Sequence, residues 1–234
     1  MPMSQETEIL KNVPLFAGLD EAALTLLAGR LRRRKMPPGT PVVYKGDPAG
    51  ALYLIASGRV KVHQATSSGD DVILEVMGPG DFFGEMSLLD GQPRSADVST
   101  LSATELLLLE GEALRQTVTE QPTVAWTLLR ILSQRLRDMD DRAEMLMTRD
   151  VAGRVADWLL RLAKSHGTAL PDGKSIRLDV SLTQSDIAAL IGATRERVSR
   201  ALTAFRKSGA ILWDKDEGRW IIKNQAALAK RAQM

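Results

Sequence analysis

The sequence predicts an α+β protein with an N-terminal antiparallel β-barrel, one long helix, and a C-terminal part in which helices flank a small β-hairpin. Three observations predict this arrangement. Residues 40–110 contain short apolar or alternating runs that turns interrupt at close intervals, as in antiparallel barrels and sandwiches. From Pro122 the apolar residues follow the period of a helix. The last third of the 234-residue chain alternates helical patterns with short extended runs.

The N-terminal part is predicted to open with a helix over residues 22–31, for which Asp20 is the N-cap candidate. The basic run 32–35 is interpreted as the solvated end of this helix. Glycine-containing turns then separate the strand candidates, because their residues tolerate the backbone angles that turns require. The strand candidates are residues 41–44, 51–55, 59–63, 72–76 and 96–109.

The long helix carries one narrow apolar stripe. Starting at Ala125, apolar residues recur at alternating spacings of four and three, which is the seam of a coiled coil over three heptads. A regular stripe beside many charged residues favours pairing with a second copy of the chain over packing against its own barrel. We therefore expect a homodimer. The predicted seam residues are Leu129, Leu132, Leu136, Met139, Ala143 and Leu146.

The C-terminal part has the pattern of a winged helix-turn-helix. Thr183 and Asp186 have the spacing of a capping box, and Gly192 interrupts the helical pattern before it resumes. The predicted helices cover residues 151–163, a short segment after Thr183, and 195–207. The predicted extended pieces cover 176–180, 211–213 and 220–222, and the last two form a hairpin.

Composition excludes several classes of function. The chain has no cysteine, which excludes disulfides, iron–sulfur clusters and cysteine-ligated zinc. His63 is expected to face solvent and His166 to cap a helix, so we expect no metal or haem. No apolar run reaches the ~20 residues of a membrane helix, and the N-terminus lacks the pattern of a secretory signal. The sequence therefore predicts a cytoplasmic protein without a membrane partner.

Charge is distributed unevenly along the chain. Residues 1–149 carry 16 basic against 20 acidic side chains, a net charge of −4. Residues 150–234 carry 15 against 9, a net charge of +6. A compact basic segment is typical of a surface that approaches phosphates, so the C-terminal part is expected to bind double-stranded DNA.

The segment 82–96 suits an anionic ligand. Gly84 and Glu85 begin what is predicted as one helical turn, and Arg94 and Ser95 follow a tight turn. Backbone N–H groups at the helix start, the Arg94 guanidinium and the Ser95 hydroxyl can hold a cyclic phosphodiester. An ionised Glu85 can accept a hydrogen bond from a ribose 2′-OH. The alternative interpretation is a structural ion pair between Glu85 and Arg94 across a loop.

The second helix of the predicted helix-turn-helix has a charged exposed side. Arginine can read guanine and glutamate can accept from cytosine, so an Arg-Glu-x-x-x-Arg pattern suits base reading. The alternative is a helix face that is merely solvated. The predicted DNA-binding residues are Thr183, Thr194, Arg195, Glu196, Ser199 and Arg200.

Both segments resemble the CRP/FNR family of bacterial transcription regulators, in its cyclic-AMP receptor protein branch. Residues 84–89 and 93–96 resemble the phosphate-binding cassette of cyclic-nucleotide-binding domains, and residues 46–58 are similar to the glycine-punctuated strands of that domain. The resemblance implies a jelly-roll cyclic-nucleotide-binding domain over residues 1–121. It also implies a dimerisation helix and hinge over 122–149 and a winged helix-turn-helix over 150–234.

The resemblance also implies roles for single residues. Glu85 would bind the 2′-OH and Arg94 the cyclic phosphate, while Arg195, Glu196 and Arg200 would read TGTGA-like palindromic half-sites. RNA polymerase would be a further partner, and cyclic AMP the effector. The implied ligand-binding residues are Gly84, Glu85, Met86, Ser87, Arg94, Ser95, Met139 and Asp140.

The match departs from the family where the long helix meets the nucleotide base. The family has a hydroxyl-bearing pair there, whereas this chain has Met139 and Asp140. Met139 also lies on the seam, and Asp140 can accept from a purine amino group or be solvated. Cyclic GMP, cyclic di-GMP and a ligand-independent regulator therefore stay open. A regulatory subunit of an enzyme is the alternative from another class, and the DNA-binding segment disfavours it.

Overall fold

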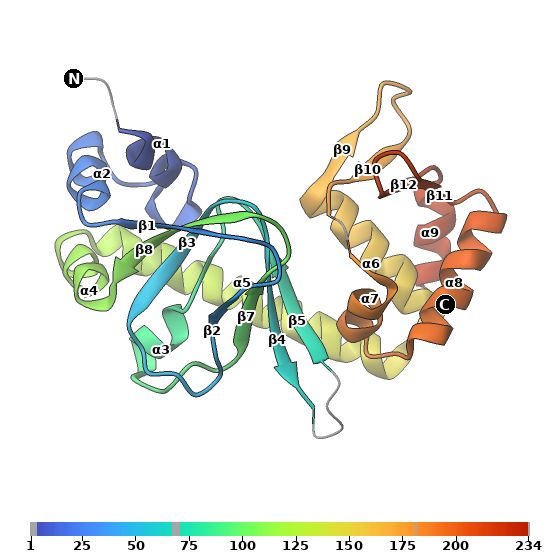
Figure 1. Cartoon of the computed structure of the whole chain (residues 1–234), viewed down its shortest axis with the longest axis horizontal. Helices are drawn as coiled ribbons and strands as arrows, with labels where there is room; N and C mark the ends of the chain where they lie inside the picture. Colours follow the sequence, from blue (N-terminus) through green and yellow to red (C-terminus); the bar gives the residue numbers. More distant parts are fainter. Residues whose placement is uncertain (1–3, 67–70, 181, 234) are drawn as a thin grey trace. The chain divides into compact units, whose positions relative to one another are not determined.

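The computed structural model describes residues 4–66, 71–180 and 182–233 (Figure 1). These residues form two compact units, residues 1–137 and 138–234, and the division falls inside the long helix α5 (Pro122–Thr148). Each unit is described by itself below.

The N-terminal unit is a jelly-roll of two four-stranded sheets rather than one closed barrel. The strand orders are β1-β8-β3-β6 and β2-β7-β4-β5, and the pairs within both sheets are antiparallel. The strands are β1 (Arg32–Met36), β2 (Pro41–Val43), β3 (Ala51–Ser57), β4 (Val60–Ala65), β5 (Asp71–Met77), β6 (Phe82–Phe83), β7 (Asp97–Thr100) and β8 (Thr104–Glu110).

Apolar side chains fill the space on both faces of the first sheet. On one face Ile55 and Leu106 pack with Val60 and Val98 of the second sheet. On the other face Leu52, with its neighbours from β8, packs against helices that cover the sheet. Truncating one such fully buried leucine to alanine costs about 2–5 kcal/mol, so these two cores hold the strands in register. The covering helices are α1 (Gln5–Lys11), the 3-10 helix η1 (Pro14–Phe16), α2 (Glu21–Ala28), α4 (Gly111–Glu120) and the first turns of α5.

The prediction for the basic run 32–35 was wrong. These residues form β1, an edge strand that pairs with β8, and not the end of a helix. Arg33 donates to Glu6 at 2.7 Å and to Glu105 at 2.6 Å. Positive side chains on an edge strand discourage pairing with another sheet. The acidic partners of Arg33 are distant in sequence, so the sequence pattern around residues 32–35 does not reveal these ion pairs. The Asp20 N-cap of α2 is confirmed, because its carboxylate accepts from the Ala23 N–H at 2.8 Å.

The C-terminal unit packs helices against a small sheet with strand order β11-β12-β10-β9. The predicted helix 195–207, the capping box of Thr183 and the hairpin are confirmed. Its helices and strands are α6 (Val151–His166), β9 (Gly167–Ala169), β10 (Ile176–Leu178), α7 (Gln184–Ile191), α8 (Arg195–Lys207), β11 (Ile211–Asp214), β12 (Arg219–Ile222) and α9 (Gln225–Ala232).

Ion pairs hold the corner between α5 and α6. Asp150 is the N-cap of α6, where it accepts from the Gly153 N–H at 2.8 Å and pairs with Arg231 of α9. The neighbouring Arg149 donates to Asp157 at 2.7 Å. These contacts tie Arg149 and Asp150, the two residues between α5 and α6, to α6 and α9.

Asp150→Ala is expected to lower the free energy of unfolding of the C-terminal unit by about 1 kcal/mol, because an N-cap is lost. The Gly153 N–H and the Arg231 guanidinium hold the pKa of Asp150 below its ordinary 3.8. A depressed carboxyl pKa stabilises the fold above the unfolded-state value and loses this effect as the pH falls through the folded-state value. The difference between wild type and variant is thus full at neutral pH and shrinks below pH 3.8.

Thermal unfolding followed by tryptophan fluorescence measures this difference, because three of the four tryptophans, Trp158, Trp213 and Trp220, lie in the C-terminal unit. The matched control is Asp216→Ala in the exposed hairpin turn, which is expected to change the stability little. Equal stabilities of Asp150→Ala and wild type at neutral pH would contradict the capping role.

Candidate functional site

A left-handed glycine lies near the start of the segment 82–96, which is predicted to hold an anion and is called the anion cradle below. The chain leaves β6 at Gly84, whose φ of 88° suits glycine, and then forms the short helix α3 (Glu85–Asp90). A Cβ atom at position 84 would overlap Arg94 Nη1 and would lie 3.1 Å from the Ala51 carbonyl oxygen. Glycine is therefore required at this position both by the backbone conformation and by the close approach of Arg94.

Arg94 lies in the interior of the N-terminal unit, with 5% of its surface exposed. Its Nη1 donates to the Gly84 carbonyl and its Nη2 to the Ala51 carbonyl, both at 2.7 Å. The guanidinium lies 5.6 Å from the centre of the Tyr53 ring, which stacks on Phe83. Its Nε is buried and has no hydrogen-bond partner.

No carboxylate among the described residues forms an ion pair with Arg94. The alternative interpretation, a structural ion pair between Glu85 and Arg94, is therefore wrong. A buried cation without a counter-charge is costly, and an anion bound at the free Nε would offset that cost. The residues present thus fit a phosphate group.

Glu85 is 3% exposed and pairs with an arginine that the sequence interpretation missed. Arg135 of α5 donates from Nη1 to Glu85 Oε1 at 2.6 Å and from Nη2 to the Phe82 carbonyl at 2.8 Å. The Arg135 guanidinium also lies 5.0 Å from the centre of the Phe82 ring. The only sequence signal for this pair was that Arg135 directly precedes the seam residue Leu136 on the predicted long helix. A carboxylate accepts several hydrogen bonds, so Glu85 can hold Arg135 and still accept from a ligand hydroxyl.

The remaining predicted ligand residues differ in their surroundings. Met86 is exposed and Ser87 is buried, and the hydroxyl of exposed Ser95 lies 3.9 Å from the Met86 sulfur. The fold brings Gly84 to Ser87, Arg94 and Ser95 together. Met139 and Asp140 are exposed on α5 in the C-terminal unit, so their approach to this cradle stays a prediction.

The predicted seam residues are mainly accessible in the single chain. Leu136 is 61% and Met139 64% exposed, and Leu129 is likewise exposed. Leu132 is half-buried and packs partly against the core of its own unit. Ala143 and Leu146 are exposed in the last turns of α5. Large exposed apolar side chains along one stripe favour a covered interface.

The helix-turn-helix presents its predicted reading residues to solvent. Arg195, Glu196 and Arg200 are exposed and Ser199 is half-buried, while the opposite side of α8 packs inward through Val198 and its neighbours. Hydrogen bonds from its own backbone N–H and from Thr194, with nearby Arg195 and Arg200, hold the pKa of Glu196 below its usual value. Glu196 is therefore ionised and acts only as an acceptor at neutral pH.

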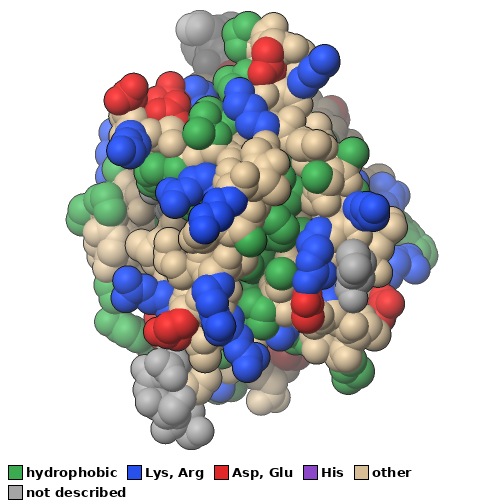
Figure 2. All heavy atoms as spheres, turned by 90° about the vertical axis from the view of Figure 1, so that its right-hand side faces the viewer, with side chains coloured by type: hydrophobic (Ala, Val, Ile, Leu, Met, Phe, Trp, Pro, Cys, Tyr) green, Lys and Arg blue, Asp and Glu red, His purple; other side chains and the backbone are tan. Residues whose placement is uncertain are grey.

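Thr183 and Thr194 begin the two helices of this motif. The Thr183 hydroxyl is occupied by the capping box with Asp186, from which it accepts the backbone N–H at 3.1 Å. Thr194 is exposed as the N-cap of α8. Figure 2 shows Lys and Arg side chains spread over the face that the C-terminal unit turns to the viewer, with fewer acidic ones.

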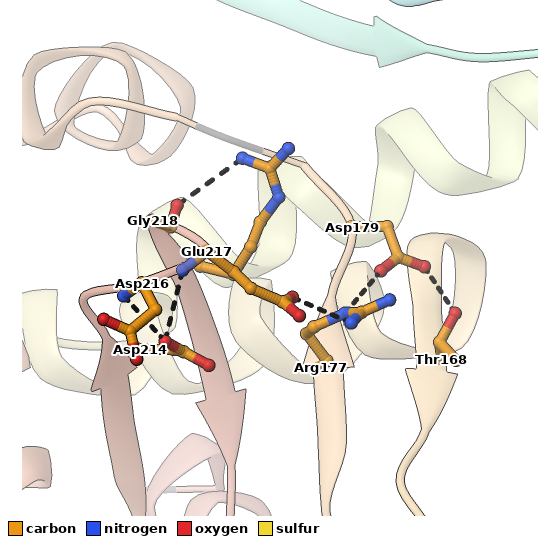
Figure 3. A network of polar contacts seen from close by, with 8 residues as sticks. Thr168, Arg177, Asp179, Asp214, Asp216, Glu217 and Gly218 are labelled. Carbon is orange, nitrogen blue, oxygen red and sulfur yellow. Dashed lines mark hydrogen bonds and ion pairs between the residues drawn. The ribbon is translucent and has the colours of Figure 1, made fainter.

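The hairpin turn of the wing is acidic and is tied to β10. Arg177 donates to Glu217 at 2.8 Å and to Asp179 at 3.2 Å, and Asp179 accepts from Thr168 at 2.6 Å (Figure 3). Asp214 accepts from the backbone N–H groups of the turn. Carboxylates repel DNA phosphates, so the basic surface for DNA is better supplied by α8 than by the tip of this turn.

The prediction that His63 faces solvent was wrong. It is half-buried, with Nε2 at 3.0 Å from the Ser99 hydroxyl and Nδ1 at 3.4 Å from Asp71. Over residues 4–66, 71–180 and 182–233, no three acidic or histidine side chains gather as they do around a metal ion. Among the helices described, none combines the length and the apolarity needed to cross a membrane.

Comparisons with known proteins define the class of this protein. Residues 33–121 match the family model of the cyclic nucleotide-binding domain, and residues 153–231 match that of the Crp-like helix-turn-helix domain. Together these two matches describe a regulator with one domain for a cyclic nucleotide and one for DNA.

Individual relatives agree with this class. The chain is 37% identical to the CRP-like cAMP-activated global transcriptional regulator of Mycobacterium tuberculosis, over 97% of this chain and 99% of the relative. It is 37% identical to the cyclic AMP receptor protein of Thermus thermophilus, over 86% and 89% of the two chains. A solved structure of the c-di-GMP responsive global regulator CLP of Xanthomonas campestris matches with a TM-score of 0.73 and 26% identity, over 87% and 99%.

The chain belongs to the CRP/FNR family of bacterial transcription regulators. It is a transcription regulator with a cyclic nucleotide-binding domain, not an enzyme.

Proposed function

We propose that this protein is a homodimeric transcription regulator in which a cyclic mononucleotide, with cyclic AMP as the first candidate, controls binding to palindromic DNA with TGTGA-like half-sites. Its proposed domains are residues 1–121 for the nucleotide, 122–149 for dimerisation and 150–234 for DNA. It works in the cytoplasm and acts on transcription through RNA polymerase. The relatives named for cyclic AMP support the choice of effector.

The observation that carries the proposal is the buried Arg94 with its unpaired Nε and no carboxylate partner among the described residues. An anion bound inside the jelly-roll would neutralise this guanidinium. Glu85, close by in the chain, supplies a hydrogen-bond acceptor for a ribose hydroxyl. When bound, the nucleotide supplies the counter-charge for Arg94 and a hydroxyl for Glu85. Glu85 also holds Arg135 at 2.6 Å, so ligand contacts reach α5 through one ion pair.

Control of DNA binding then follows as a shift between two arrangements of the dimer. A ligand that contacts Glu85, and through it Arg135 on α5, favours the arrangement in which both recognition helices match successive major grooves. The size of the response cannot exceed the difference in affinity of the nucleotide for the two arrangements.

Base identity is expected to depend on Asp140. A carboxylate accepts from the N1–H and N2–H groups of guanine, and this favours cyclic GMP as the second candidate effector. Asp140→Ala should change the ratio of cyclic AMP to cyclic GMP affinity more than it changes the affinity of the better ligand. Calorimetric titration of both nucleotides measures the ratio, with exposed Asp141→Ala as the matched control. An unchanged ratio would remove Asp140 from the base site.

Base reading is expected to depend on Arg200. Arg200→Ala should cost ~1–3 kcal/mol on the specific site and relax preference at one base pair, whereas loss of a phosphate contact weakens all sequences alike. Fluorescence anisotropy with a TGTGA palindrome and with scrambled DNA separates the two effects. If Arg200→Ala weakens both DNAs equally, the assignment of α8 to base reading is wrong.

The experiment that tests the whole proposal combines the two sites. Calorimetry with cyclic AMP, cyclic GMP and cyclic di-GMP identifies the effector, and gel shift with each nucleotide shows whether it changes DNA affinity. The proposal expects one cyclic mononucleotide to bind and to strengthen DNA binding.

A further inference from the structure

The turn between α7 and α8 is held by a side chain from another helix. Gly192 ends α7 in the left-handed conformation, with a φ of 63°. The last carbonyls of a helix have no partner within the helix, and cations near them are favourable. Arg154 of α6 supplies a hydrogen-bond donor and a positive charge at this helix end. Its Nη1 donates to the Ile191 carbonyl at 2.9 Å and to the Gly192 carbonyl at 3.2 Å.

Among the residues that the structure describes, no carboxylate explains the position of Arg154. No carboxylate among the described residues pairs with it, and its Nε is buried without a hydrogen-bond partner. An ion pair therefore does not set the direction of this side chain. The hydrogen bonds to the turn set this direction. Replacing Arg154 by a shorter side chain would leave two backbone carbonyls without their donor, which is costly.

A second side chain contacts the turn from α5. A Cβ atom at Gly192 would lie 3.3 Å from Leu146 Cδ2 and 3.7 Å from Arg154 Nη1. Leu146 is the last residue of the predicted seam, yet in the single chain it lies against the helix-turn-helix. Neighbouring Met145 is buried in the same unit. The end of the dimerisation helix is thus in contact with the turn that precedes the reading helix.

We propose that Arg154 is a positioning residue for DNA reading, and that Leu146 acts with it. Together they fix the turn at Gly192, and this turn sets the direction in which α8 begins at Arg195. A movement of the last turns of α5 is then passed directly to the base-reading residues. This inference rests on the proposed DNA-reading function, to which it adds two residues that need not contact DNA.

The test compares binding of full-length variants to two DNAs. One is the sequence that the wild type selects from a random library, and the other is scrambled DNA. Arg154→Gln should weaken binding to the selected site about tenfold, as loss of one base contact does, and leave scrambled DNA and its salt dependence unchanged. Arg154→Lys should recover part of the affinity, because an ammonium still donates to a carbonyl. Leu146→Ala should act in the same direction as Arg154→Gln.

Lys207→Gln on α8 is the matched control, because loss of an exposed cation should weaken both DNAs alike. The inference is overturned if Arg154→Gln behaves like this control, since Arg154 would then contact phosphate directly. It is also overturned if Arg154→Gln and Leu146→Ala both bind the selected site like wild type. If the wild type selects no sequence, the proposed DNA-reading function itself fails. Thermal unfolding shows which variants are folded, and Arg154→Lys and Leu146→Ala carry the test if Arg154→Gln is not.

Discussion

Arg94→Leu is expected to abolish binding of the cyclic nucleotide, raising its dissociation constant at least about 100-fold, because hydrogen bonds to charged groups contribute ~1.5–3 kcal/mol each. The reason is specific to this site. Arg94 is the buried cation without a carboxylate partner among the described residues, so its replacement removes the charge that calls for an anion. Nucleotide-dependent DNA affinity should disappear with it, while the dimer persists. Isothermal titration calorimetry and sedimentation measure the two properties.

Two further variants separate ligand contact from local folding. Arg94 also serves the carbonyls of Gly84 and Ala51, so leucine leaves both without this donor. Arg94→Lys keeps the charge but loses the planar fork, and it should bind measurably but weakly. Arg115→Leu on the surface of α4 is the matched control and should bind like wild type. Wild-type affinity of Arg94→Leu would show that Arg94 does not hold the ligand.

Leu136→Glu is expected to convert the proposed dimer into monomers, with a dissociation constant raised by a factor of about 100 or more. Leu136 lies at the centre of the seam and is 61% exposed in the single chain. A glutamate there would be buried without a partner in the dimer, and such a change costs about 3–5 kcal/mol. Binding to palindromic DNA should weaken as well, because a monomer contacts one half-site. Sedimentation velocity over a concentration series measures the change.

Arg130→Glu is the control for this substitution, since residue 130 is exposed on α5 but outside the stripe. It should leave the dimer intact. A dimer of unchanged affinity in Leu136→Glu would contradict the assignment of α5 as the dimer interface.

Local signals explain what could be predicted from the sequence. The capping box of Thr183 and the break at Gly192 place α7 and α8, because capping and left-handed glycine act within one turn of the chain. The anion cradle could be predicted because its residues lie in one short segment, in which Gly84 and Arg94 are ten residues apart.

Contacts between distant segments explain what was missed. The pair Arg135–Glu85 joins residues 50 positions apart and exists only because α5 packs on the first sheet. Strand β1 was missed because its basic sequence lacks the apolar alternation by which strands are predicted. It pairs with β8, where Arg33 forms an ion pair with Glu105. The contact of Leu146 with the helix-turn-helix likewise depends on the corner at Asp150, which no periodicity records.

In the proposed function, a cyclic nucleotide controls specific DNA binding. Fluorescence anisotropy of wild-type protein on a TGTGA palindrome, with cyclic AMP, cyclic GMP, cyclic di-GMP or no nucleotide, tests it most directly. We expect one cyclic mononucleotide to raise the affinity for the palindrome about tenfold or more, a coupling free energy within the usual range of ~1–3 kcal/mol. Scrambled DNA should show no comparable rise. Equal affinity for the palindrome under all four conditions would contradict it.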